Sequence, residues 1–329
     1  VDNKDRENEG DLVVPASKAN PKKINFMAKH GRGLICLALT SKKVKKLNLP
    51  LMSLINKSRT QTAFTVSIES KKGISTGISA YDRAKTVKVA IKPSSTKKDI
   101  VSPGHVFPLV AKNGGVLERA GHTEASVDIS KLAKLNPSAV ICEVMNEDGT
   151  MARYKDLIPF AKKHRLKIAK IEDLISYRLK NEIFVRCISS KKIKIKNFGN
   201  FDLKTFKNKL DGSEHYAITK GKFNSSKASR VRVISTNILN SFFNLNKNIF
   251  KNTLKHLIRF NSFALILIKG TNPNPTSSEK SNILRYYGVG AQIIKELKIK
   301  NMILVSRSKK RVIALKGYGI KITKQEIIK

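Results

Sequence analysis

The chain has 329 residues, enough for two domains that each bury a core, and its formal net charge at pH 7 is +41. No apolar run reaches the roughly 18 residues that a membrane-spanning helix needs. The charged first residues also lack the basic and then apolar order of a secretory signal. The sequence therefore predicts a cytoplasmic protein without a membrane segment.

The positive charge is spread over both halves of the chain. Residues 1–180 contain 34 Lys and Arg against 17 Asp and Glu, and residues 181–329 contain 31 against 7. Such an excess is typical of nucleic-acid-binding proteins. The lysines, however, stand singly or in pairs among Asn and Ile, as an A- and T-rich genome would produce, and no RNA-binding pattern of interleaved aromatic residues accompanies them. Nucleic-acid binding stays an alternative, chiefly for residues 181–329.

The three cysteines, Cys36, Cys142 and Cys187, lie far apart in the sequence and form no Cys-x-x-Cys pair. This spacing fits a reducing compartment and argues against a structural zinc site. Cys36 and Cys142 lie in apolar runs, so we expect both to be buried. Cys36 follows a glycine-rich HGRG segment and is also a candidate for the wall of a pocket.

The chain opens with five carboxylates within ten residues, namely Asp2, Asp5, Glu7, Glu9 and Asp11. Their mutual repulsion has to be offset by cations. Oxygen-rich clusters of this kind bind hard divalent metals such as Mg²⁺. A solvated acidic turn without a metal is the alternative interpretation.

Apolar patterning predicts the elements that follow. Predicted helices cover 21–30 and 155–165, predicted strands cover 33–39, 64–70 and 138–145, and the first domain closes near Lys180. Between two of these elements, the segment 76–86 begins with a Thr-Gly turn that offers hydroxyls and backbone N–H groups to an anion.

The segment from Pro103 to Ala125 looks most like a functional site. Its glycines and prolines interrupt any regular helix, and it concentrates polar groups, namely His105, Glu118, Arg119, His122, Thr123 and Glu124. We therefore expect an irregular loop segment that carries function. Either histidine alone is better explained as an ordinary loop residue, and only the cluster favours a site.

Glu143 interrupts the apolar strand predicted at 138–145. A carboxylate in a buried strand is costly unless it is paired or bound to a metal, so we expect Glu143 to face a site or a partner cation. The alternative is that it faces solvent at a sheet edge.

Five motifs together resemble 3,4-dihydroxy-2-butanone 4-phosphate synthase of riboflavin biosynthesis. They are DRENEGD at 5–11, TGISAYDRA at 76–84, PGHVFPL at 103–109, ERAGHTEA at 118–125 and CEVMNEDGTMAR at 142–153. The resemblance covers essentially all of residues 1–180 and implies a domain with the α/β (α+β) sandwich fold of that family. Chains of the family begin earlier, so we expect a leading helix and most of a first strand to be missing before Val1.

Members of this family convert D-ribulose 5-phosphate into L-3,4-dihydroxy-2-butanone 4-phosphate and formate, in a homodimer with active sites at the subunit interface. The resemblance implies that Glu7 and His122 bind Mg²⁺ or Mn²⁺, with two ions per site, and that His105 and Glu143 are catalytic. The substrate contacts that it implies are Arg6, Glu7, Asp11, Thr76, Arg119, Ala120, Gly121, His122, Thr123 and Glu143. Of these, Arg119, Thr123 and Thr76 match positions at the phosphate.

These residue types suit the chemistry. Enolising a ketose needs a base near a carbon acid and a Lewis acid on the carbonyl oxygen. A carboxylate and an imidazole, as in Glu143 and His105, provide two groups whose pKa values can be set apart for acid and base roles. Arg119 offers the forked donors that suit a phosphate.

The second half resembles GTP cyclohydrolase II, a domain often fused behind the synthase, which implies a second α/β domain over residues 181–329. The resemblance rests on SEHYAITKGKF at 213–223, RVRVIST at 230–236 and the stretch 284–322. The zinc site of that family needs three cysteines, yet no cysteine follows Cys187, and the arginine-rich catalytic loop has no match in 265–282. Convergence of Cys187, His215 and His256 in space is the remaining route to a zinc site.

We therefore expect a metal-dependent carbon–carbon lyase whose second domain keeps its fold but binds no zinc and opens no GTP. Two alternatives stay open. One is a bifunctional enzyme that also opens GTP, and the other is a basic nucleic-acid-binding protein with a vestigial enzyme domain.

Overall fold

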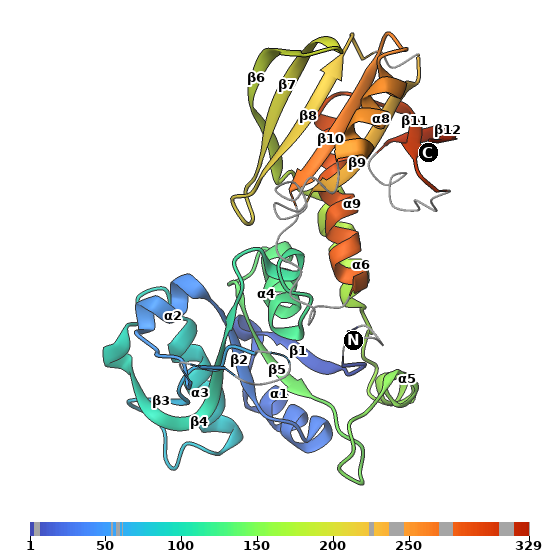
Figure 1. Cartoon of the computed structure of the whole chain (residues 1–329). Coiled ribbons are helices and arrows are strands. Elements are labelled where there is room, and N and C mark those ends of the chain that lie inside the picture. The colour runs from blue at the N-terminus through green and yellow to red at the C-terminus, as the bar shows by residue number, and fades with distance from the viewer. Residues whose placement is uncertain are drawn as a thin grey trace. The chain divides into compact units, whose positions relative to one another are not determined.

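The computed structural model describes residues 1–2, 7–53, 55–56, 60, 62–223, 227–236, 247–269, 279–308 and 319–328. The chain forms two compact units, unit 1 (Val1–Ile175) and unit 2 (Ser176–Lys329), each with its own mixed sheet (Figure 1). This confirms the expected two-domain α/β architecture. The division falls inside α6 (Ile171–Asn181), a few residues before the expected boundary. No helix in the described ranges is long and apolar enough to cross a membrane.

Unit 1 is built around a five-stranded sheet in the order β1-β5-β2-β4-β3. The strands are β1 (Asp11–Pro15), β2 (Cys36–Thr40), β3 (Ile68–Ser70), β4 (Ile100–Ala111) and β5 (Ser138–Glu143). Strand β2 pairs in parallel with β4, and the other three pairings are antiparallel. Because side chains alternate along a strand, successive residues of β2 face opposite sides of this sheet.

Three helices cover one face of the sheet, namely α1 (Pro21–Phe26), α2 (Ser41–Leu47) and α3 (Ala80–Ile91). Their apolar residues join Leu37, Leu39 and Val140 in the main core of unit 1. On the other face lies α4 (His122–Leu132), where Val127 packs on Ala38 and Ala111 (Figure 1). Beside α4, this face carries the second apolar cluster of Cys36, Leu109, Ala139 and Ile141, which lies under a pocket.

Capping explains where several helices begin. The Asn20 side chain accepts a hydrogen bond from the Lys23 N–H, and Pro21 fits the first turn of α1, where its missing N–H costs nothing. The predicted helix at 21–30 is present, with its last turn widened to a π-turn from Met27 to Gly31. The helix predicted at 155–165 corresponds to α5 (Tyr154–Lys163). The strand predicted at 64–70 is shorter, because only Ile68–Ser70 pair regularly.

The expectation of an irregular loop from Pro103 to Ala125 holds only for the link at 112–121, with its short 3₁₀ turn (Gly115–Leu117), and is wrong for both ends of the segment. Strand β4 runs through Pro103 and Gly104 to Ala111, and α4 begins at His122. Gly104 does not break the strand. It lets β3 approach, because a Cβ at this position would lie 2.2 Å from the carbonyl carbon of Ile68.

Unit 2 contains a seven-stranded sheet in the order β12-β11-β9-β10-β8-β7-β6. The strands are β6 (Val185–Ile195), β7 (Gly199–Asn208), β8 (Glu214–Lys220), β9 (Ser229–Thr236), β10 (Phe263–Lys269), β11 (Asn301–Ser306) and β12 (Lys321–Ile327). Helix α8 (Lys247–Leu257) packs Leu254 and Leu257 into the core of this sheet. Helix α9 (Glu279–Glu296) contacts β6 and β10.

Candidate functional site

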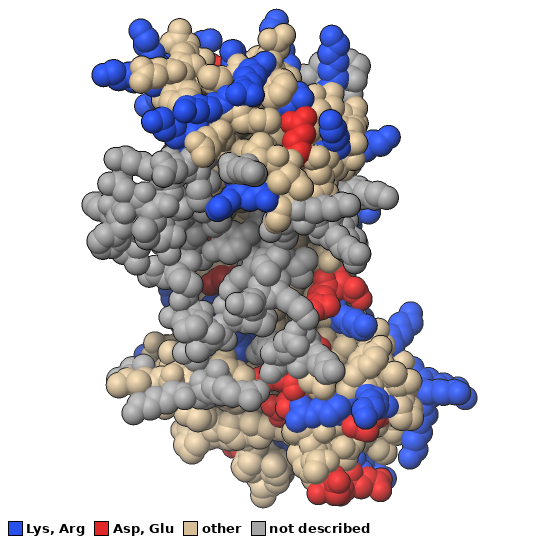
Figure 2. Space-filling model, turned by 45° about the vertical axis from the view of Figure 1, so that its right-hand side comes forward, with Lys and Arg blue, Asp and Glu red and all other residues tan. Residues whose placement is uncertain are grey.

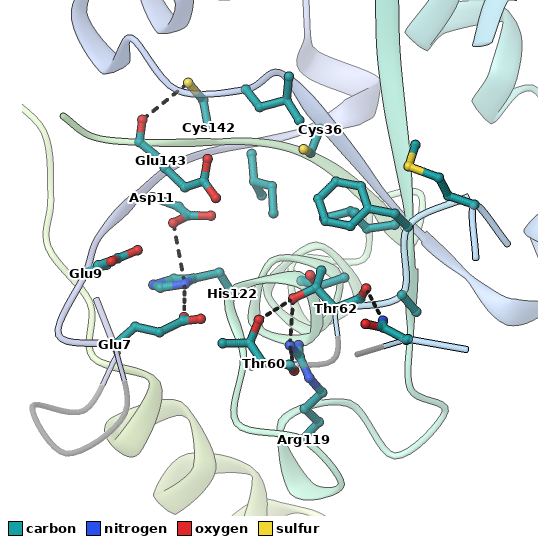
Figure 3. Close-up of a pocket in the computed structure, with 18 of the residues that line it drawn as sticks. Glu7, Glu9, Asp11, Cys36, Thr60, Thr62, Arg119, His122, Cys142 and Glu143 are labelled. Carbon is teal, nitrogen blue, oxygen red and sulfur yellow. Dashed lines mark hydrogen bonds and ion pairs between the residues drawn. The ribbon is translucent and has the colours of Figure 1, made fainter. Parts of the chain in front are cut away.

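A pocket of about 560 Å³ lies on the partly covered face of the unit 1 sheet (Figure 3). Strand pairing brings its acidic residues together, because Asp11 at the start of β1 lies opposite Glu143 at the end of β5. His122, the first residue of α4, points into the same space. Other lining residues are Arg119, the sheet residues Cys36, Leu109 and Ile141, and residues at 51–53, 56, 60 and 62–64.

Two side chains of the pocket, Glu7 and His122, form with the nearby Asp2 a group that has the geometry of a metal site. The ligand atoms of Asp2, Glu7 and His122 all lie within 4.8 Å of one another. Nδ1 of His122 lies 3.9 Å from Oε2 of Glu7 and 3.4 Å from Oδ1 of Asp11. Two carboxylates and an imidazole suit Mg²⁺ or Mn²⁺, which prefer oxygen-rich sites, so the residues fit the metal that the resemblance implies.

The turn that carries Glu7 is held in place by hydrogen bonds. The Asp2 carboxylate accepts the backbone N–H groups of Glu7 and Glu9, at 3.2 and 2.9 Å. From the start of α5, Nη1 of Arg153 donates to the Glu7 carbonyl oxygen at 2.6 Å and to Oε1 of Glu9 at 3.2 Å. The guanidinium therefore offsets part of the repulsion among these carboxylates.

Asp11 is the most perturbed acid of the pocket. Its side chain is only 3% exposed, and Oδ1 has no hydrogen-bond partner in the structure. Burial raises the pKa of this carboxyl to about 7, and the nearby charges of Glu7, Asp2 and Glu9 act in the same direction. A divalent cation bound beside Asp11 would stabilise its ionised form.

Glu143 lines the pocket from the end of β5, where its side chain points toward the same region as Asp11 (Figure 3). The residue is exposed, so it does not lie within the buried part of the strand. The pocket walls nevertheless remove part of the hydration of its carboxylate. This desolvation, followed by the charge of Asp11, raises the pKa of Glu143.

Cys36 also lines the pocket, as the sequence suggested. Its side chain is buried, and burial raises the pKa of the thiol far above its usual range. Burial likewise raises the pKa of the neighbouring Cys142 to about 12. Both residues are therefore neutral wall residues rather than nucleophiles.

Arg119 lies in the link between a short 3₁₀ turn and α4. Its Nη1 donates to Oε2 of Glu124 at 2.7 Å, and its Nη2 donates to the Thr60 carbonyl oxygen and to Oγ1 of Thr62, both at 3.0 Å. Gly121 allows this conformation, because a Cβ there would lie 2.3 Å from Nη1 of Arg119. Ala120 lies between these two residues, and the buried Thr123 completes this side of the pocket.

His105 and Thr76 do not line this pocket. His105 hydrogen-bonds through Nδ1 to Glu69 of β3, next to Gly77, and both His105 and Thr76 are exposed. His105 lies near the β3 edge, on the same sheet face as Leu109, since these two residues are four apart on β4, and Thr76 directly precedes Gly77 beside His105. Arg6 lies outside the described residues.

The structure thus gathers Glu7, Asp11, Arg119, His122, Thr123 and Glu143 in one pocket, and sets His105 and Thr76 apart. Residues that the sequence reasoning did not assign are Asp2, Thr60, Thr62, Glu124 and Arg153. Asp2 belonged to the acidic cluster that raised the possibility of a metal. Nothing in the sequence marks the two threonines, because their role depends on how the segment folds over Arg119.

Comparison with known proteins identifies the family of unit 1. The family model of 3,4-dihydroxy-2-butanone 4-phosphate synthase matches residues 1–177, more than half of the chain. The chain belongs to this synthase family. The family model of GTP cyclohydrolase II matches residues 186–262 and 267–326, so unit 2 is a GTP cyclohydrolase II-like domain.

Relatives of the synthase family match both units or unit 1 alone. The riboflavin biosynthesis protein RibBA of Aquifex aeolicus is 42% identical over 358 residues, covering all of this chain and 88% of that protein. RibBX, a two-domain synthase from A. baumannii, has a crystal structure that superposes with a TM-score of 0.84 at 40% identity, covering 100% of this chain and 94% of that one. A synthase in complex with two magnesium ions has a TM-score of 0.53 at 38% identity, covering 55% of this chain and 89% of that one.

The cysteine and histidines of the cyclohydrolase-like unit 2 do not form one group. Cys187 and His215 each lie opposite Phe206, from β6 and β8, so two strand spacings of about 5 Å separate their backbones. His256 on α8 contacts Glu326 of β12, at the other edge of the sheet. Across the described ranges, the one group of three metal-ligating side chains within 4.8 Å is that of Asp2, Glu7 and His122.

Proposed function

We propose that unit 1 converts D-ribulose 5-phosphate into L-3,4-dihydroxy-2-butanone 4-phosphate and formate, in a metal-dependent step of riboflavin biosynthesis. The observation that carries this proposal is the meeting of Glu7 and His122 with Asp11 and Glu143 in one pocket, where Asp2 completes a possible metal-binding group with Glu7 and His122. Family membership supports the same reaction. The intact pocket argues against a vestigial first domain.

The residues of the site would have separate roles in metal binding, proton transfer and phosphate binding. Asp2, Glu7 and His122 would hold Mg²⁺ or Mn²⁺, which supplies Lewis-acid stabilisation of the enolate oxygens. The raised pKa of Glu143 suits a carboxylate that accepts and returns a proton near neutral pH. Arg119 lies on the opposite side of the pocket from Glu143 (Figure 3), and Thr123 lines the same pocket, so these two residues suit the phosphate end of the substrate.

A metal titration tests the metal assignment. The protein, stripped with EDTA, should regain formate production when Mg²⁺ is added, and His122→Ala should raise the Mg²⁺ concentration needed for half-maximal activity by a factor of about 100 or more, as loss of a ligand predicts. Calorimetry with Mn²⁺ provides a readout that does not depend on turnover. Full activity in metal-free buffer would refute this assignment.

We also propose that the enzyme is a homodimer whose sites are shared. His105 and Thr76 lie outside the pocket of their own chain, and three exposed apolar residues lie in the same part of unit 1, namely Ile78, Tyr81 and Val101. The pocket-lining segment exposes two more, Leu51 and Met52. A two-fold dimer presents the same surface twice, so it would bring the His105 group of each subunit to the pocket of the other.

Mixed dimers distinguish a shared site from one within a single chain. At a Mg²⁺ concentration that just saturates wild type and lies far below the raised requirement of His122→Ala, His105→Asn and His122→Ala should each be nearly inactive alone. After mixing and re-equilibration, a shared site predicts recovery of about a quarter of the wild-type activity, because half of the dimers then contain one intact site of two. If His105 acts within its own subunit, no mixed dimer contains an intact site, and activity stays at the level of the single variants.

We further propose that unit 2 has no GTP cyclohydrolase activity. No cysteine follows Cys187 in the sequence, and His215 is occupied by hydrogen bonds with Ser213 and the Lys269 N–H. Zinc sites need thiolate or imidazole ligands close together. Elemental analysis for zinc and a formate assay with GTP test the proposal, and stoichiometric zinc together with GTP turnover would establish the bifunctional alternative instead.

A further inference from the structure

Glu124 is a buried carboxylate next to the pocket that the proposed reaction does not itself use. It lies in the first turn of α4 and is 1% exposed. Its Oε1 accepts the backbone N–H of Lys112 at 3.1 Å, and its Oε2 accepts Nη1 of Arg119 at 2.7 Å. Burying a carboxylate is costly unless it is paired and hydrogen-bonded, so these two contacts are what allow Glu124 to be buried.

Arg119 needs such a partner. It belongs to neither a helix nor a strand, and a free arginine side chain has many rotamers. Glu124 holds Nη1, and the Thr60 carbonyl oxygen and the Thr62 hydroxyl hold Nη2. A guanidinium has five N–H donors, so the three bonds to protein leave donors for a ligand in the pocket.

The pair of Glu124 and Arg119 also connects β4 with α4. Lys112, whose N–H Glu124 binds, follows the last residue of β4, while Glu124 itself lies two residues after His122. The carboxylate therefore connects the end of β4, the start of α4 and the guanidinium. The N-terminus of α4 favours the negative charge at this point.

We propose that Glu124 is a positioning residue that fixes the guanidinium of Arg119 for the phosphate group of the substrate. This inference rests on the proposed function of unit 1. Since the phosphate is remote from the reacting carbons, a displaced guanidinium should weaken binding of the substrate and of its transition state alike. The KM should then rise more than kcat falls.

The test compares Glu124→Gln with Asp128→Asn. Asp128 is the matched control, because it is a buried carboxylate one turn further along α4 that accepts the Val116 N–H at 2.8 Å. Glu124→Gln should raise the KM for ribulose 5-phosphate and the Ki of inorganic phosphate by about tenfold or more, with kcat within about threefold. Mn²⁺ affinity should not change. Asp128→Asn should lower the melting temperature and leave both constants near the wild-type values.

Two further variants keep the test decisive. Glu124→Asp restores the charge with a shorter side chain, so its KM should lie between those of wild type and Glu124→Gln. In the Arg119→Ala background, Glu124→Gln should add little to the KM, because the two residues act as one unit. An additive effect in that background, or a Glu124→Gln variant with lower stability and an unchanged KM, would overturn the proposal.

Direct binding of inorganic phosphate separates this inference from the proposed function. If wild type releases no formate, the proposed reaction fails. The dependence of phosphate binding on Glu124 is measured by calorimetry in the same samples, without turnover. Equal phosphate affinity in wild type and Glu124→Gln would then contradict the positioning role on its own.

Discussion

At the scale of single residues, the acidic side chains in the pocket of unit 1 differ in their burial. Asp11 and Glu143 lie opposite each other in the β1–β5 register, yet the Asp11 side chain is buried and Glu143 is exposed. Desolvation raises the pKa of both, and that of Asp11 reaches about 7. Two acids whose surroundings differ in this way provide distinct roles in one site.

His105→Asn and Glu143→Gln should each lower kcat by a factor of about 100 or more, as expected when a positioned acid or base is lost. Both side chains are exposed and both substitutions nearly keep the volume, so the melting temperature should stay within about 2 °C of wild type. Steady-state kinetics and thermal denaturation check the two parts. A folded variant with normal turnover would assign that residue a structural role.

At the scale of elements, β3 and β4 approach closely at Gly104. Its Cβ, if present, would lie 2.2 Å from the carbonyl carbon and 2.3 Å from the carbonyl oxygen of Ile68. Both contacts are with backbone, which cannot rotate away as a side chain can. The edge strand with Glu69, and with it the hydrogen bond to His105, depends on this approach.

Gly104→Ala should therefore destabilise unit 1 by about 3 kcal/mol, as overpacking against backbone predicts. Gly149→Ala is the matched control. Gly149 has a φ of 84° and no atom within 4 Å of its added Cβ, so the substitution should cost only about 1 kcal/mol of backbone strain. Denaturant unfolding measures both, and equal losses would mean that β3 shifts to accommodate the methyl group.

In unit 2, the carboxylate of Glu326 in β12 contacts side chains from β9 and α8. Glu326 of β12 accepts two hydrogen bonds from Arg230 of β9, at 2.9 and 3.0 Å, and lies 3.3 Å from Nε2 of His256 on α8. Burial alone would raise the pKa of Glu326, but the hydrogen bonds from Arg230 and His256 outweigh it and lower the pKa below its usual value. The ionised form therefore stabilises the folded state.

Glu326→Gln should lower the stability of unit 2 by about 2 kcal/mol at pH 7, because a charge-assisted pair is lost. The lowered pKa means that this difference is fully present above about pH 4.5, the ordinary value of the group, and shrinks as pH falls further. Urea unfolding of both proteins between pH 7 and pH 3.5 checks this. A difference that grows in acid would have the wrong sign.

At the scale of the whole molecule, Lys and Arg outnumber Asp and Glu in both halves of the chain. Lys and Arg side chains are scattered over the face shown in Figure 2, and acidic groups lie among those of unit 1. In the edge strand β6 and just after it, Lys191, Lys192, Lys194 and Lys196 are exposed. Lysines on an edge strand oppose pairing with another sheet, which explains them without an RNA partner.

Much of the fold and of the pocket could be predicted from the sequence, because its motifs indicate both a family fold and the residue types of a reactive site. Glu7, Asp11, His122 and Glu143 meet as their motifs implied, and the two α/β units are present. The separation of His105 from the pocket was not predictable, since a motif does not say how far its residues lie from those of another motif in the fold.

Burial and loop folding account for the other differences between what the sequence predicted and what the structure shows. Glu124 was one polar residue among several in its segment, and its buried contact with Arg119 appears only once α4 packs on the sheet. Gly104 and its neighbouring prolines suggested a loop, because sequence alone does not distinguish a glycine that breaks a strand from one that admits a neighbouring strand.

The most direct test of the central claim is to incubate the full-length protein with ribulose 5-phosphate and Mg²⁺ and to quantify the products by NMR. The proposed reaction predicts formate and a four-carbon phosphate in equal amounts, both abolished by EDTA and strongly reduced by His122→Ala at a Mg²⁺ concentration that just saturates wild type. A folded, metal-loaded protein that consumes no ribulose 5-phosphate, or that converts it without releasing formate, would contradict the claim.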